Sequence, residues 1–166
     1  MLNAGYEWYP EASRVCADIA KETDHLFDTV CDVVAAFSPR LHWSRNIKVA
    51  RMFLEGQHYD RPAGTLGRSY DRALGAVTHG YIRGNGRKVA NFARNLQRDL
   101  TSVTVDVWTA RALGCGDLPM SNNLYSKLET AIRLAAEACH CYPAELQAIL
   151  WCHQKQQTPR WTGGTA

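Results

Sequence analysis

The sequence predicts an all-α protein, and three features of the chain indicate this fold class. Apolar residues recur at the three- and four-residue spacing of a helix face along most of the chain. No segment alternates apolar and polar residues over the length of a strand, apart from a short ambiguous pair at Val103 and Val105. Glycine and proline stand between the periodic segments, where they end helices or form loops. With 166 residues, 46% of them hydrophobic, the chain can bury a sizeable core.

Each periodic segment begins or ends at a residue that favours a helix boundary. Pro10 suits the first turn of the first helix, Asp24 is a candidate cap for the second, and Pro39 ends the second. Thr104 and Asp106 indicate the N-terminal cap of a later helix, with Asp106 in its first turn. The remaining helices are expected at residues 44–54, 69–82, 88–96, 107–113, 124–139 and 143–152.

The chain is expected to form one compact domain over residues 1–157, followed by a flexible tail at residues 158–166, which are polar and rich in glycine. The formal net charge of +3 permits nucleic-acid binding without requiring it. The basic residues are better placed than this total suggests, because many of them fall in two groups. The groups are Arg40, Arg45, Lys48 and Arg51, and Arg83, Arg87, Lys88, Arg94 and Arg98.

The compartment is expected to be the cytoplasm. No apolar run approaches the roughly 18 residues that a membrane-spanning helix needs. The first ten residues lack the charged and apolar zones of a signal peptide. Six cysteines in a helical chain of this kind are expected to be reduced.

Four residues near the C-terminus are of types that bind zinc: Cys139, Cys141, Cys152 and His153. The spacing of Cys139 and Cys141 suits a tetrahedral site poorly, and the cysteines fall in predicted helices. Small side chains for packing explain them better. We therefore expect no metal and no other cofactor.

A glycine-rich turn that leads to a lysine is the most informative motif. The stretch Gly84-Asn85-Gly86-Arg87-Lys88 opens the amphipathic segment 88–96, so the turn is expected to end at a helix N-terminus. Backbone N–H groups point outward there and favour a phosphate. Lys88 can bind phosphate, act as an amine nucleophile once it has lost its proton, or be an ordinary exposed lysine. Asp106 follows it by 18 residues and is a candidate partner carboxylate or only a helix cap.

The motif G-x-G-R-K-x-A-N, with V-D following, resembles the helix-hairpin-helix DNA glycosylase superfamily, and most closely its endonuclease III branch. The resemblance implies a helix-hairpin-helix DNA-binding motif and double-stranded DNA as the partner. It also implies removal of a flipped base, with or without lyase cleavage at the abasic site. Lys88 would be the Schiff-base nucleophile and Asp106 the second catalytic residue. The residues that hold the DNA backbone would be Arg83, Gly84, Asn85, Gly86, Arg87 and Arg94.

The resemblance extends upstream to residues 35–50, where the family inserts a side chain into the duplex. Arg40, His42 and Trp43 follow the Ser38-Pro39 break there. Arg40 would fill the gap that the flipped nucleotide leaves, and Trp43 would stack on a base. Equally, Trp43 can be a core residue and Arg40 a solvated one.

The chain departs from the family pattern at two hairpin positions. Asn85 stands where an aliphatic residue is usual, and Arg83 where a proline commonly precedes the first glycine. The cysteines also lack the spacing of the family's iron–sulfur cluster. Two alternatives therefore stay open: a short phage enzyme of thymine hypermodification, acting in the host cytoplasm, and a non-catalytic DNA-binding module.

Overall fold

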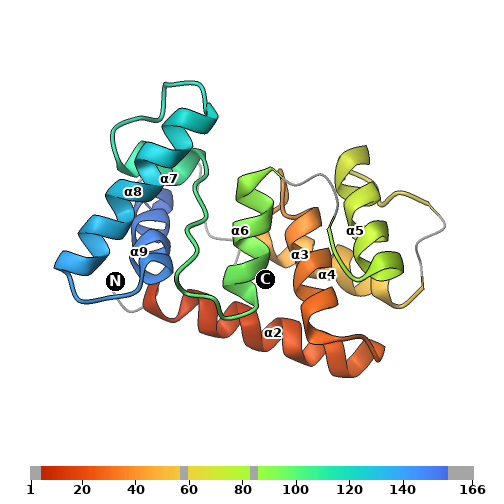
Figure 1. The fold of residues 1–166 in the computed structure, drawn as a ribbon. Helices are drawn as coiled ribbons and strands as arrows, with labels where there is room; N and C mark the ends of the chain where they lie inside the picture. Colours follow the sequence, from red (N-terminus) through yellow and green to blue (C-terminus); the bar gives the residue numbers. More distant parts are fainter. Residues whose placement is uncertain (1–4, 57–59, 83–85, 157–166) are drawn as a thin grey trace. The chain divides into compact units, whose positions relative to one another are not determined.

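The computed structural model describes residues 5–56, 60–82 and 86–156, and every regular element within these ranges is a helix (Figure 1). The predicted all-α fold class is therefore confirmed. The helices are α2 (Trp8–Thr23), α3 (Phe27–Phe37), α4 (Trp43–Leu54), α5 (Gly67–His79), α6 (Arg87–Leu96), α7 (Val107–Ala112), α8 (Asn122–Ala138) and α9 (Pro143–Gln156). None of the helices in these ranges has the length and apolar character needed to span a membrane.

The chain divides into two compact units, and each is described by itself. The central unit is Glu11–Asp99, and the terminal unit is Met1–Pro10 with Leu100–Ala166. Helices α3 to α6 belong to the central unit and α7 to α9 to the terminal unit, while α2 contributes residues to both. The single domain expected over residues 1–157 stays a prediction.

Helix α3 forms the core of the central unit. It is apolar on nearly every side, and such a helix is stable in water only when neighbours cover it all round. Figure 1 shows α3 between α5 and α6, and it packs on α4 as well. Edge-to-face contacts of Phe53 with Phe37 (5.3 Å between ring centroids) and Tyr70 (5.9 Å) join α3, α4 and α5. The buried residues of α3 are Val30, Cys31, Val33, Val34, Ala35, Ala36 and Phe37.

Two helix boundaries differ from the sequence expectation. Asp24 has φ 54°, in the left-handed region, so it lies in the turn before α3 and does not cap it. Leu26 is the residue at the N-cap position of α3 instead. Helix α5 ends at His79, before the expected Ile82, because Gly80 adopts the left-handed conformation (φ 75°) that terminates helices.

The terminal unit has a core of its own, in which a tyrosine side chain makes hydrogen bonds to the backbone of the segment before α7. Val103 and Val105 are buried in a segment without regular secondary structure, just before α7. The Tyr125 hydroxyl donates to the Val103 carbonyl (2.9 Å) and accepts from the Val105 N–H (3.2 Å). The ambiguous pair is therefore held by a side chain of α8. The core cluster is Val103, Val105, Ala110, Tyr125, Leu128 and Ile132.

Candidate nucleic-acid interface

Positive charge is concentrated in one stretch of the sequence. Residues 40–98 hold 12 of the 19 Lys and Arg residues but only 3 of the 16 Asp and Glu residues, a formal charge of +9. Residues 1–39 hold 2 basic and 7 acidic residues, a formal charge of −5. The separation of charge was readable from the sequence, but it disappears in the overall charge of +3. A segment this basic favours a polyanionic partner.

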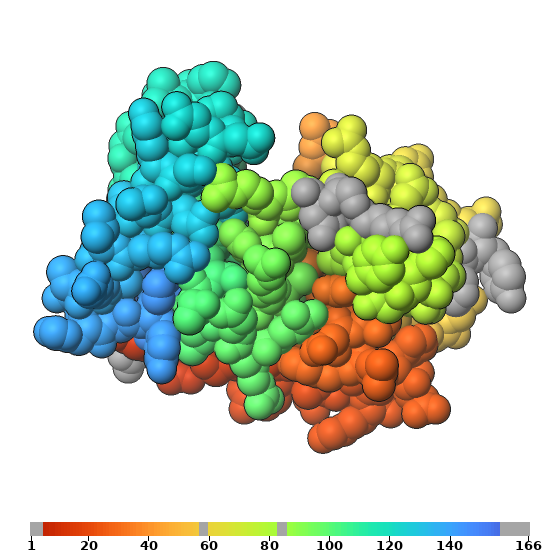
Figure 2. Space-filling model, viewed as in Figure 1, coloured from red at the N-terminus to blue at the C-terminus, as the bar shows by residue number. Residues whose placement is uncertain are grey.

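Three helices of the central unit begin at the same end, where α3 finishes. Figure 1 shows α4, α5 and α6 starting there. Arg45 in the first turn of α4 donates to the Ala63 carbonyl (2.8 Å), which ties α4 to the segment before α5. In the space-filling view these two segments, orange and yellow, are adjacent (Figure 2). We call this region the basic end; it comprises the starts of α4, α5 and α6 with Arg40, Arg45, Arg68, Arg87 and Lys88.

The helices at the basic end have no side-chain cap at their first turns, a feature they share with α3, whose N-cap residue is Leu26. Their N-cap residues, His42, Leu66 and Gly86, make no side-chain capping hydrogen bond in the described structure. Helices α7 and α8 of the terminal unit are capped by side chains, those of Asp106 and Ser121. A helix N-terminus without a side-chain acceptor presents N–H groups and a partial positive charge to an incoming anion. Three such termini and five cations therefore favour phosphate at one end of the unit.

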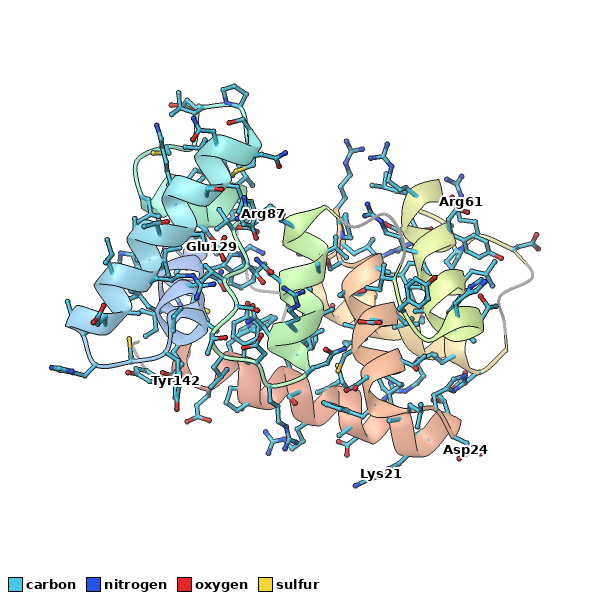
Figure 3. All side chains as sticks on the ribbon, viewed as in Figure 1. Lys21, Asp24, Arg61, Arg87, Glu129 and Tyr142 are labelled. Atoms are coloured by element: carbon cyan, nitrogen blue, oxygen red, sulfur yellow. The ribbon has the colours of Figure 1, made fainter. Side chains whose placement is uncertain are left out.

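Not every basic residue of the segment is equally available to a partner. Arg51 forms an ion pair with Glu22 (2.7 Å), so its charge is partly neutralised within the protein. Burial, together with the neighbouring charge of Arg68, lowers the pKa of Arg72. An anion bound beside Arg68 would relieve the repulsion between these two guanidinium groups. Figure 3 shows Arg61 and Arg87 toward the basic end, and Lys21 and Asp24 at the opposite end of the unit.

Lys88 lies in the first turn of α6. It is half-buried, whereas Arg87 beside it is exposed. Gly86 at the N-cap has φ −66° and ψ 143°, an ordinary extended conformation, and a Cβ there would meet no atom within 4 Å. The fold therefore does not require glycine at this position. Because glycine has no side chain, the backbone at the start of α6 is left uncovered. Arg83, Gly84 and Asn85 lie outside the described residues, so the hairpin turn itself stays a prediction.

The upstream candidates lie in the turn between α3 and α4, at the basic end. Arg40 is exposed and adopts φ 66°, a left-handed conformation that is uncommon for residues with a Cβ. His42 is exposed at the N-cap of α4, and Trp43, its first residue, is half-buried. The half-buried state of Trp43 is compatible with stacking on a base and with packing in the core, the two roles that the sequence left open. Arg94 is exposed on α6 and donates to Asn91 Oδ1 (3.5 Å).

Asp106 caps α7, as the sequence predicts. Its Oδ1 accepts from the backbone N–H groups of Trp108 (3.0 Å) and Thr109 (2.9 Å) and from the Thr109 hydroxyl (3.1 Å). Its Oδ2 accepts from the Trp151 indole N–H (3.1 Å). The indole contact could not be predicted, because Trp151 is 45 residues from Asp106 and no local pattern connects them. The carboxylate is consequently fixed by four donors.

Lys88 and Asp106 belong to different units. Lys88 is in the central unit and Asp106 in the terminal unit, so each half of the predicted catalytic pair is described alone. Their meeting at one nucleotide stays a prediction. In the described part of the chain, no three His, Cys, Asp or Glu side chains are grouped to hold a metal ion.

An all-α fold with a basic end and a capping aspartate does not by itself define a function. Comparison with protein families places the chain plainly: it belongs to a family of unknown function (DUF7178), whose model matches residues 1–158. No curated protein and no solved structure matches the chain.

Proposed function

We propose that this protein binds the phosphate backbone of double-stranded DNA through its basic end. The observation that carries the proposal is the formal charge of +9 over residues 40–98, together with the common starting point of α4, α5 and α6. Phosphates contacted in this way fix a protein on the duplex without specifying a sequence. The partner is therefore duplex DNA of any sequence, and the cytoplasm stays the expected compartment.

The proposal is tested by measuring affinity for a fluorescent duplex at several salt concentrations. Each phosphate that the protein neutralises contributes about −0.9 to the slope of log affinity against log salt. Arg87→Gln should weaken binding to all sequences alike and reduce the magnitude of that slope by about 1. Arg14→Gln is the matched control, since Arg14 is exposed on α2 and belongs to the acidic N-terminal stretch. Equal losses in the two variants would remove the basic end from the interface.

A second candidate function is catalytic: a DNA glycosylase, or glycosylase with lyase activity, acting on a flipped base. Two observations favour it over a plain binding module. Lys88 is a half-buried amine at an open helix start, where a sugar–phosphate could dock. Asp106 presents a rigid carboxylate that could stabilise positive charge as the base leaves. In this candidate Lys88 attacks the sugar C1′ and Asp106 assists.

Borohydride trapping tests the catalytic candidate. If Lys88 forms a Schiff base with an abasic duplex, reduction should give a covalent adduct that Lys88→Ala abolishes while DNA affinity largely persists. Asp106→Asn should keep binding and lower turnover about a hundredfold, the usual effect of losing one electrostatic partner of the transition state. A normal adduct in Lys88→Ala would show that the nucleophile is another amine.

The substrate panel should contain abasic, uracil, oxidised-pyrimidine and modified-thymine duplexes. Base release identifies a glycosylase. A product altered at a thymine substituent, with the glycosidic bond intact, identifies the phage-type hypermodification enzyme. Binding without any product leaves the non-catalytic module.

A further inference from the structure

Asp106 stands at the end of a chain of hydrogen bonds that crosses the terminal unit. The Tyr9 hydroxyl on α2 donates to Gln147 Oε1 on α9 (2.8 Å), and Gln147 Nε2 donates to the Thr109 hydroxyl on α7 (3.2 Å). That hydroxyl donates in turn to Asp106 Oδ1 (3.1 Å). The three elements are therefore linked by side-chain polar contacts, not by apolar packing alone.

Each bond in the chain has a fixed direction. An amide oxygen only accepts and an amide nitrogen only donates, so Tyr9 must donate to Gln147, and Gln147 must donate to Thr109. The Thr109 oxygen is thereby occupied as an acceptor, and its own hydrogen is directed to the carboxylate. Burial raises the pKa of the Tyr9 hydroxyl, so this first donor keeps its proton.

The three side chains of this hydrogen-bond chain are polar, yet they are almost completely buried. Tyr9 is 4% exposed, Gln147 3% and Thr109 0%. Apolar side chains of the same size could fill these positions without having to satisfy hydrogen-bonding groups. A fully satisfied polar chain instead selects one orientation of the group at its end. That group is the Asp106 carboxylate.

The two oxygens of this carboxylate are used differently. Oδ1 accepts three hydrogen bonds, all from α7, so it is committed to the helix start. Oδ2 accepts one among the described residues, from Trp151. The indole is held in turn by Trp8 (5.7 Å between rings) and by Lys155, whose Nζ lies 3.9 Å from the ring centroid. Oδ2 thus keeps capacity for one more donor in a defined direction.

We propose that Gln147 is a positioning residue, which acts through Thr109 to hold Asp106 with Oδ2 directed at a hydrogen-bond donor of the bound nucleotide. This inference rests on the catalytic candidate for the role of Asp106, and deepens it. The ligand class is a nucleotide that presents an N–H, an O–H or developing positive charge to Oδ2. Gln147 itself touches no substrate.

The first test measures hydrogen exchange of the Trp151 indole proton by NMR, which needs no substrate. Gln147→Met keeps the side-chain length and removes both the donor to Thr109 and the acceptor of the Tyr9 hydroxyl. The exchange of the indole proton and of the Trp108 and Thr109 amides should accelerate about tenfold, the effect of losing one such hydrogen bond. The Ile132 amide in the core of α8 should be unchanged.

A matched pair at Thr109 separates positioning from packing. Thr109→Val keeps the volume and loses the hydroxyl, whereas Thr109→Ser loses a methyl and keeps the hydroxyl. If the Thr109 hydroxyl positions Asp106, Thr109→Val should accelerate exchange of the indole proton and Thr109→Ser should exchange at the wild-type rate. If Thr109 only fills space, Thr109→Ser should accelerate exchange and Thr109→Val should not. Unchanged indole exchange in both Gln147→Met and Thr109→Val would overturn the proposal, as would acceleration that includes Ile132 to the same extent.

The functional arm uses a duplex that the wild type processes. Gln147→Met should lower kcat about tenfold with KM unchanged, because it alters the aspartate and not the DNA contacts. If the wild type processes no duplex, the catalytic candidate fails, while the exchange measurements still decide whether Gln147 positions Asp106.

Discussion

Gly86→Val is the change that best isolates a DNA contact from the stability of the fold. Gly86 has backbone angles that any residue adopts, and a Cβ at this position has open space around it. The substitution should therefore alter the free energy of unfolding by less than about 1 kcal/mol. It places a branched side chain at the start of α6, where a phosphate would approach the backbone. A hydrogen bond to a charged group contributes about 1.5–3 kcal/mol, so duplex affinity should fall about tenfold or more.

The assay compares urea unfolding with duplex affinity for the same variant. Gly75→Ala is the matched control: it changes a glycine within α5 of the same unit, and its Cβ would make only an ordinary contact, 3.7 Å from the Tyr81 carbonyl oxygen. Gly75→Ala should bind as the wild type does and be slightly more stable, since alanine favours a helix interior over glycine. A stable Gly86→Val protein with wild-type affinity would show that no phosphate approaches this turn.

Three further predictions concern stability and metal content. Burial, with the charge of Asp28 next, raises the pKa of Asp32 to about 6 from its usual 3.8, so ionised Asp32 opposes folding. This cost is absent below about pH 4 and complete above about pH 6. Asp32→Asn should therefore stabilise by about 1 kcal/mol at pH 7.5, less than the roughly 3 kcal/mol of a fully buried carboxylate because water screens this partly exposed one, and hardly at pH 4 in urea unfolding. Gly5→Ala should destabilise by about 1–3 kcal/mol, because the Cβ would lie 2.5 Å from Ile149 Cα; an unchanged unfolding midpoint would contradict that packing. Elemental analysis should find a colourless protein without stoichiometric zinc or iron, and about one metal per chain would show that the cysteines were misread.

The helices were predictable because local signals determine them. The spacing of Val30, Val33, Val34 and Phe37 predicts a helix with one buried side, and all four residues are buried in α3. Asp106 before the apolar segment 107–113 predicts an N-cap, and the carboxylate makes the capping bonds. The end of α5 was also encoded, by Gly80, but the apolar pattern through Ile82 obscured it. The left-handed Asp24 could not be distinguished from a capping aspartate by residue type.

The candidate site was less predictable, because its contacts join distant parts of the chain. Tyr9 and Gln147 are 138 residues apart, and Gln147 and Thr109 are 38 apart. Periodicity along one helix places Gln147 on a face but does not identify the partner of that face. The division of the chain into two units could not be predicted from the sequence for a related reason. The first boundary falls after Pro10, inside α2, where no change of composition marks it.

The most direct test of the central claim is an NMR map of the amide signals that shift when plain duplex DNA is added at low salt. We expect shifts at the starts of α4, α5 and α6, including Arg45, Arg68 and Lys88, with the same pattern for duplexes of unrelated sequence. Signals of Lys21 and Asp24 at the opposite end should not move. Shifts confined to that opposite end, or an unchanged spectrum at saturating duplex, would contradict DNA binding by the basic end.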